Sequence, residues 1–178
     1  SIIGLALDGE AVLSNQNEGI YAQASEVLAS NNIISANHGA GIGGSDMGLT
    51  LTGSFIGLTL SGDAAGNAGH GIETEGSPGI YINGATKHNI ISANQGDGVH
   101  IFNNCGGNND VDEGILVGNY IGTNVSGLVI DGFGNGGSGV RIDEWNGFCA
   151  SVENVQVGGV NVADENIIAG NTEDGVRV

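Results

Sequence analysis

A short motif, in which Asn is followed by three variable residues, Gly and then Ile or Val, occurs six times in the 178 residues. The copies begin at Asn15, Asn37, Asn67, Asn94, Asn135 and Asn171. Their glycines stand at positions 19, 41, 71, 98, 139 and 175, so the spacing varies between 22 and 41 residues. Paired helices must keep a fixed length to keep their register, so helical repeats do not tolerate such a variable period. A β-solenoid tolerates it, because extra residues bulge out at the corners of its coils.

Each copy of the motif is expected to form the same corner of a coil. Asn accepts left-handed backbone angles and bonds to neighbouring backbone, while Gly lets the chain bend into the next strand. In stacked coils the six asparagines would form one continuous side-chain ladder, in which each amide donates to the carbonyl of the next. The residues after the Gly alternate, as in Val99-His100-Ile101. This alternation predicts a strand with its apolar side chains inward.

Two further strand classes recur between the motifs. One reads NIISAN at residues 32–37 and 89–94 and NIIAGN at 166–171. The other covers residues 1–9, 54–62 and 119–127, and NVQVGG at 154–159 takes its place in the last coil. Counted together, the classes give about three short strands per coil and about six coils. The sequence therefore predicts an all-β protein with a single β-solenoid domain over residues 1–178, uncapped at both ends.

The charge of the chain restricts its partners. Three basic residues, Lys87, Arg141 and Arg177, stand against 20 acidic ones, which gives a net charge of -17. This balance excludes ordinary binding to the phosphate backbone of nucleic acids. It also disfavours anionic membranes, and it disfavours polyanionic polysaccharides unless cations are present. No apolar run reaches the roughly 18 residues of a membrane span, so membrane insertion is not expected.

The repeats resemble those of right-handed parallel β-helix proteins of the pectate-lyase-like superfamily. The resemblance is closest to long bacterial secreted or cell-surface repeat proteins, and it rests on NYIGTN at Asn119, NVQVGG at Asn154, NIIAGN at Asn166 and GVRI at Gly139. It covers essentially the whole chain and implies a right-handed parallel β-helix, which is a single-stranded β-solenoid. It is not specific for function, because this superfamily includes lyases, hydrolases, adhesins and scaffolds.

Two cysteines lie just past the same strand in consecutive coils. Cys105 follows Val99 by six residues, and Cys149 follows Val140 by nine. Stacked strands are about 4.8 Å apart, so the two residues would come within the Cα separation that a disulfide needs. We expect a Cys105–Cys149 disulfide, although two unrelated thiols are the alternative. A disulfide would place the protein in an oxidising compartment, outside the cell or at its surface.

The segments around the cysteines are also the candidate metal and ligand sites. Their acidic residues could converge as oxygen ligands for calcium, although a solvated acidic loop is the simpler interpretation. These residues are Asp110, Asp112, Glu113, Asp143 and Glu144. No other cofactor is indicated. Trp145, Phe148 and Phe102 are expected to cover a corner of the core rather than stack on a sugar ring.

No catalytic residues are expected. Gly69-His70-Gly71 is similar to the GHG of polygalacturonases, and Arg141-Ile142 is similar to the start of their RIK motif. However, His70 fills a variable slot of the repeat, and the NTD and DD motifs that supply the paired carboxylates of that family are missing from the sequence. The other histidines, His38, His88 and His100, fall in different coils and strand classes, so a histidine-based metal site is not expected either.

Open terminal coils expose apolar core and unpaired strand edges. Two interpretations fit: a fragment of a longer solenoid, or a subunit that associates end to end through its terminal coils. The sequence therefore favours a non-catalytic extracellular structural β-solenoid, as a filament subunit or a segment of a cell-surface fibre or adhesin, with glycans as a further candidate partner. The alternative is a polysaccharide-binding β-helix or a pectin-type lyase or hydrolase.

Overall fold

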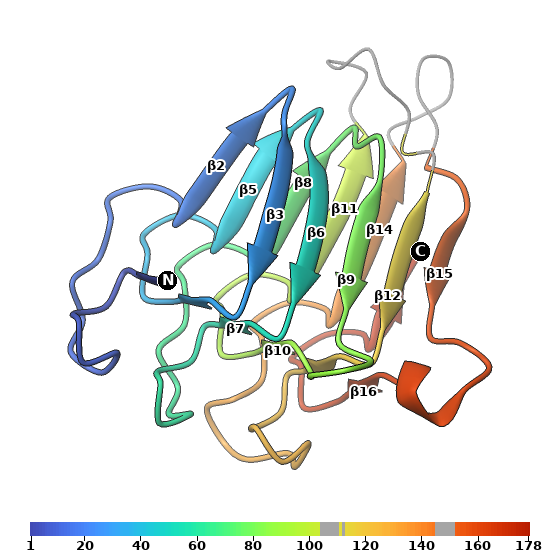
Figure 1. Cartoon of the computed structure of the whole chain (residues 1–178). Helices are drawn as coiled ribbons and strands as arrows, with labels where there is room; N and C mark the ends of the chain where they lie inside the picture. Colours follow the sequence, from blue (N-terminus) through green and yellow to red (C-terminus); the bar gives the residue numbers. More distant parts are fainter. Residues whose placement is uncertain (104–110, 112, 145–151) are drawn as a thin grey trace.

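The computed structural model describes residues 1–103, 111, 113–144 and 152–178. The chain winds into a right-handed parallel β-helix in which successive coils contribute one strand to each of three parallel sheets. Figure 1 shows the long strands of two of these sheets packed face to face, with the short strands of the third sheet along one side. The predicted all-β fold of about six coils, with three strands in most of them, is confirmed.

We number the sheets after their first strands. Sheet 1 consists of β1 (Ile2–Ile3), β4 (Ile33–Ile34), β7 (Phe55–Ile56), β10 (Ile90–Ile91), β13 (Tyr120–Ile121) and β16 (Ile167–Ile168). Sheet 2 consists of β2 (Ile20–Gln23), β5 (Ile42–Ser45), β8 (Ile72–Glu75), β11 (Val99–Asn103), β14 (Val140–Glu144) and β17 (Val176–Arg177). Sheet 3 consists of β3 (Glu26–Ser30), β6 (Gly48–Thr52), β9 (Ile80–Asn83), β12 (Gly114–Val117) and β15 (Val155–Val157). A single turn of 3-10 helix, η1 (Val162–Asp164), precedes β16.

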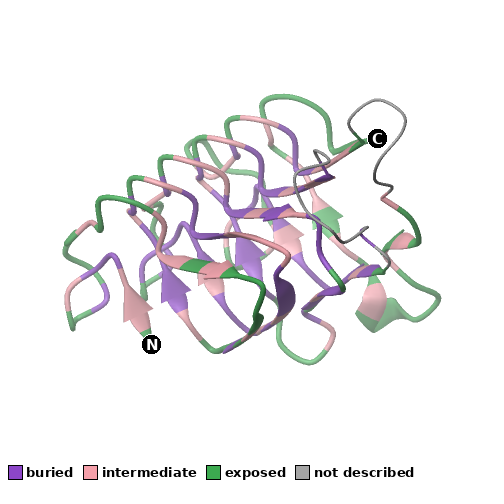
Figure 2. Ribbon diagram, turned by 90° about the horizontal axis from the view of Figure 1, so that it is seen from above, coloured by how far each residue is buried: buried purple, intermediate pink, exposed green. Residues whose placement is uncertain are grey.

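The interior is a narrow column of aliphatic side chains. Equivalent positions align from coil to coil, so that Ile42 pairs with Ile72 and Ile72 with Val99 in sheet 2. These three side chains are fully buried, and Figure 2 shows the buried residues mainly in the strands and the exposed ones mainly in the loops. Aliphatic residues of similar size can follow one another along the column because each meets the same neighbours one coil away.

The glycine of each motif marks a close contact between coils. A Cβ on Gly71 would lie 2.6 Å from the carbonyl oxygen of Gly98 and 2.7 Å from a methyl group of Ile91. Any other residue would push the coils apart, so Gly is required for packing at the start of every sheet 2 strand except the last, where a Cβ on Gly175 would meet nothing closer than 3.9 Å.

The strand classes recognised in the sequence are distributed differently from the prediction. The NIISAN class and the class that begins at residues 1, 54 and 119 both form strands of sheet 1, where they alternate from coil to coil. Both classes have two consecutive apolar residues in the strand, and they differ mainly in the turn that follows it. Gly57 and Gly122, with φ of 96° and 83°, lead into longer loops, whereas Ala93, with φ of 63°, turns directly to the next motif. The NVQVGG segment belongs to β15 of sheet 3 and not to the second class. Sheet 3 therefore contains the third strand of the first five coils, and the sequences of these strands share no consensus.

None of the helical structure in the described residues is long and apolar enough to cross a membrane.

Candidate functional site

The six motif asparagines lie in one column at the corner before sheet 2. Each side-chain amide donates to the Oδ1 atom of the next asparagine along the stack, at 2.8 to 3.0 Å. From Asn37 to Asn135, the backbone N–H of each asparagine donates to the same oxygen of its neighbour. The structure thus brings together all six residues proposed for the ladder: Asn15, Asn37, Asn67, Asn94, Asn135 and Asn171. Their role is structural, because the four central residues are buried and bonded to protein.

A second ladder at the start of sheet 1 was not found in the sequence. Asn89 donates to Asn119 at 2.9 Å, and Asn119 donates to Asn166 at 3.1 Å. In the preceding coil Ser54 takes the same position, and its backbone N–H donates to Asn89 Oδ1 at 2.9 Å. The signal was the polar residue that opens each sheet 1 strand. This signal is weak because the position holds Ser in two of the six coils and Asn in the other four.

Polar side chains gather on the outer face of sheet 2, where strands β8, β11 and β14 lie side by side. Register pairs His100 with Glu73 on one side and with Arg141 on the other. The rings of His70 and His100 have centroids 4.9 Å apart. One nitrogen of each ring and a carboxylate oxygen of Asp97 all lie within 4.8 Å of one another. The sequence comparison had set His70 apart from the other histidines. The structure brings it beside His100, because residues about one coil apart in sequence become neighbours in the stack.

Asp97 is the buried centre of this group, which we call the histidine cluster (His70, Asp97, His100, Arg141 and Asp143). Its side chain is 4% exposed, and one carboxylate oxygen accepts the backbone N–H of Ser138 at 2.6 Å. The other oxygen lies 3.3 Å from His70 Nδ1. The same Nδ1 atom accepts the backbone N–H of Asp97 at 2.9 Å. His70 Nε2 faces a carboxylate oxygen of Glu73 at 3.9 Å.

His100 connects the cluster to the next coil. Its Nε2 atom lies 3.2 Å from Asp143 Oδ2, and Arg141 Nε lies 2.6 Å from the same oxygen. Burial lowers the pKa of His100 below its usual value, and the nearby His70 lowers it further, whereas the hydrogen bond to Asp143 opposes the shift. His100 therefore favours the neutral form, in which one ring nitrogen carries no proton.

A shallow groove lies beside the cluster on the same face of sheet 2. It has a volume of about 170 Å³ and is lined by Glu18, Tyr21, Gly43, Gly44, Ser45, Glu73, Glu75 and Phe102. The two glycines form a floor without side chains between Tyr21, which is 62% exposed, and Phe102. Phe102 stacks on His100 and faces outward, so the prediction that it covers a corner of the core was wrong. Tyr21 and Phe102 stand three strands apart, a span of about 14 Å.

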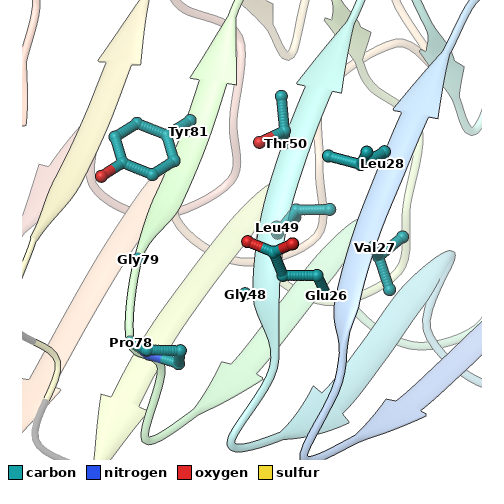
Figure 3. Close-up of a pocket in the computed structure, with 9 residues that line it drawn as sticks. All are labelled: Glu26, Val27, Leu28, Gly48, Leu49, Thr50, Pro78, Gly79 and Tyr81. Atoms are coloured by element: carbon teal, nitrogen blue, oxygen red, sulfur yellow. The ribbon is translucent and has the colours of Figure 1, made fainter.

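Sheet 3 has a comparable hollow on its outer face (Figure 3). Leu28, Thr50 and Tyr81 form a row across β3, β6 and β9, above Glu26 and Gly48. The Tyr81 hydroxyl donates to Glu113 at 2.6 Å, so its polar end already has a partner. This hollow has about the same volume as the groove of sheet 2 but no histidine at its edge.

Only some of the other predicted site residues lie in the part of the chain that the structure describes. Both cysteines of the expected disulfide, Cys105 and Cys149, lie outside them, and so do Asp110 and Asp112. The predicted calcium ligands that are described have separate surroundings. Glu113 accepts from Tyr81, Asp143 bonds in the histidine cluster, and Glu144 ends β14 with an exposed side chain.

The stacked sheets and the internal asparagine ladders define the chain as a parallel β-helix protein. No protein-family model, no curated protein and no solved structure matches the chain. The outer face of sheet 2, where the groove and the histidine cluster lie, is therefore the candidate functional surface.

Proposed function

We propose that the protein is a non-catalytic extracellular β-solenoid that binds an uncharged polysaccharide in the groove of sheet 2, in the manner of a cell-surface fibre or adhesin. Membership of the pectate-lyase-like superfamily is part of the proposal and rests on the sequence repeats. The observation that carries it is the glycine floor between the exposed Tyr21 and the half-buried Phe102.

The groove has the features that a sugar chain requires. Aromatic rings offer an apolar face to the C–H groups of a pyranose ring, and carboxylates accept hydrogen bonds from its hydroxyl groups. Glu18, Glu73 and Glu75 supply such acceptors along the groove. Its volume of about 170 Å³ is below the range of ordinary small-molecule pockets. A shallow, open groove about 14 Å long suits an extended chain better than a compact ligand.

Charge indicates which class of polysaccharide would bind. The groove contains three carboxylates among its lining residues, and the whole chain carries -17. A polyuronate would be repelled by this field, whereas a neutral glycan would not. We therefore expect neutral glucans, mannans or galactans to bind and pectate to bind much more weakly.

Filling the floor of the groove tests the proposal. In Gly43→Val the new Cβ would approach Glu18 Cγ, the nearest atom, at 3.0 Å, and Glu18 is a flexible side chain that can move aside. Gly48→Val is the matched control in the hollow of sheet 3, where the nearest atom is Glu26 Cγ at 3.2 Å. Both positions are in strands and Val favours strands, so both variants should keep the fold.

The measurement is affinity electrophoresis followed by calorimetry with the neutral glycan that binds best. We expect Gly43→Val to weaken binding about tenfold or more and Gly48→Val to leave it unchanged. Loss of binding in Gly48→Val alone would move the site to sheet 3. If the unmodified protein binds no neutral glycan, the proposal is wrong.

End-to-end self-association belongs to the same proposal. Each sheet is a stack of parallel strands, and its edge strands, such as β2 and β17 in sheet 2, carry backbone groups with the spacing of the interior. Another copy, or further coils, would extend the sheets without a change of geometry. Because the chain is strongly acidic, salt or divalent cations should strengthen such association, which sedimentation velocity measures.

Polysaccharide hydrolysis is the second candidate function, and one observation favours it. Glu73 and Glu75 stand two residues apart on the outer face of β8, and both line the groove. Such positions are about 6.6 Å apart along a strand, which is close to the separation of the two carboxyl groups in inverting glycosidases. Release of reducing ends from a bound glycan, abolished by Glu75→Gln, would establish this activity instead.

A further inference from the structure

We propose that the histidine cluster is a binding site for a divalent transition metal such as Zn²⁺, with His70, Asp97 and His100 as the protein ligands. Glu73 borders both sites, but the inference does not depend on the glycan proposal, because the three protein ligands lie outside the groove lining and the test is metal binding alone.

The contact between His70 and Asp97 is the first observation. His70 Nδ1 accepts a backbone N–H, so its lone pair is present, yet a carboxylate oxygen of Asp97 lies only 3.3 Å from it. Two lone pairs at this distance repel each other unless a positive charge lies nearby. Ligands of a tetrahedral zinc ion at about 2.0–2.1 Å are about 3.3 Å apart. Metal binding would replace the hydrogen bond that the backbone of Asp97 makes to His70.

The outer nitrogens of both imidazoles face carboxylates. His70 Nε2 is 3.9 Å from Glu73, and His100 Nε2 is 3.2 Å from Asp143. Histidines that bind metal commonly donate their second N–H to a carboxylate, which fixes the tautomer and orients the ring. In this arrangement the Nδ1 atoms of His70 and His100 are left to bind the metal.

Unpartnered polar atoms concentrate at the same place. Among the described residues, four buried side-chain polar atoms have no hydrogen-bond partner, and His100 Nδ1, Ser138 Oγ and Arg141 Nε are three of them. Arg141 Nε is near Asp143 without the alignment of a hydrogen bond. Ser138 is fully buried and bonded through its backbone to Asp97. A bound ion accounts for His100 Nδ1, which otherwise lacks its expected partner.

The charge and chemistry of the donors select the class of metal. With neutral imidazoles, Asp97, Asp143 and the neighbouring Glu73 bring three negative charges and Arg141 one positive charge, so the cluster and Glu73 together offer a net charge of -2 to a divalent cation. Two imidazoles and one carboxylate suit Zn²⁺, Fe²⁺, Co²⁺ or Ni²⁺, whereas calcium takes oxygen ligands. Three protein ligands would leave one position of a tetrahedral ion for water or a ligand.

The test is calorimetric titration of the chelator-treated full chain with Zn²⁺ and, in parallel, with Co²⁺, whose visible absorption reports its coordination geometry. The unmodified protein should bind one ion per chain and give the intense d–d bands of tetrahedral Co²⁺. His70→Gln and Asp97→Asn should lower the affinity at least a hundredfold. Asn at position 97 can still accept the N–H of Ser138, so this variant should fold. Glu73→Gln should weaken binding about 10- to 100-fold.

Two controls separate this site from others. His38→Gln removes a histidine outside the cluster, whose ring contacts Asn15, and should bind Zn²⁺ as tightly as the unmodified protein. Because thiols also bind zinc, a Cys105→Ser/Cys149→Ser variant is titrated too and should retain the tetrahedral Co²⁺ bands. The proposal is overturned if the unmodified protein binds neither ion, or if folded Asp97→Asn and His70→Gln bind as it does.

Discussion

Replacing a central asparagine of the internal ladder, in Asn94→Ala, should destabilise the protein by more than the loss of one ordinary hydrogen bond. Asn94 is buried, and its Oδ1 atom accepts both the backbone N–H and the side-chain amide of Asn67. Its own amide donates to Asn135 Oδ1 and to the carbonyl oxygen of Ile56. The residue therefore bonds to both neighbouring coils at once.

The size of the destabilisation depends on which hydrogen-bond partners of Asn94 keep another hydrogen bond after the substitution. Asn135 Oδ1 still accepts the backbone N–H of residue 94, and the oxygen of Ile56 still accepts the backbone N–H of Ser92. The side-chain amide of Asn67 keeps its bond to Ile34, but the backbone N–H of Asn67 loses its partner in the interior. An orphaned buried donor costs about 1–3 kcal/mol, and the weakened amide adds about 1 kcal/mol. We expect a loss of about 2–4 kcal/mol in unfolding free energy.

The assay is urea denaturation followed by circular dichroism, with Asn15→Ala as the matched control. Asn15 is an exposed rung whose side-chain amide donates to Asn37 and whose Oδ1 atom accepts no hydrogen bond among the described residues, so the loss of its side chain orphans no buried donor. The control should lose less than about 1 kcal/mol. Equal losses in the two variants, or a loss below about 1 kcal/mol in Asn94→Ala, would refute the argument that orphaned groups dominate.

Two further predictions concern Glu10 and the cysteines. The hydroxyl of Ser61 and, to a smaller extent, its backbone N–H donate to the Glu10 carboxylate and lower its pKa. The contact therefore stabilises the folded chain at pH values above the pKa that Glu10 has in the unfolded chain. This stabilisation is lost as the pH falls through the pKa that Glu10 has in the folded chain. NMR titration should show the Glu10 pKa rising in Ser61→Ala but not in Ser25→Ala, and an unchanged pKa in Ser61→Ala would contradict the assignment. Cys105 and Cys149 should be disulfide-bonded in protein isolated without reductant, and a mass spectrum with two free thiols would remove the argument for secretion.

The repeat could be predicted from the sequence because the same contacts between coils recur at the same corner. A buried asparagine must bond to the next coil, and Gly71 must leave room for Gly98 and Ile91, so these residue types recur at fixed spacing. Sheet 3 has no such signal. Its strands, such as Glu26–Ser30 and Gly114–Val117, share only general alternation, so they were not recognised as a class.

The histidine cluster was predictable in part. The motif already aligned His70 with Asp97 in one slot, and the residue after the first apolar position of each strand aligned Glu73, His100 and Arg141. Similarity within a slot does not reveal the cluster, because its contacts join different residue types in consecutive coils. The side-chain distances and the burial of Asp97 could not be predicted, because they depend on how closely the coils stack.

The asparagine ladder also gives the rod a chemical direction. Every amide in the column donates toward the end that carries Asn171, so the side-chain dipoles add along the axis instead of cancelling, and each bond polarises the next. The first rung, Asn15, offers an oxygen to whatever lies before it, and the last rung offers N–H groups. A coil can join this column only in the same orientation, since a reversed coil would set oxygen against oxygen. Assembly along this axis would therefore produce a polar fibre whose two tips differ in what they can bind.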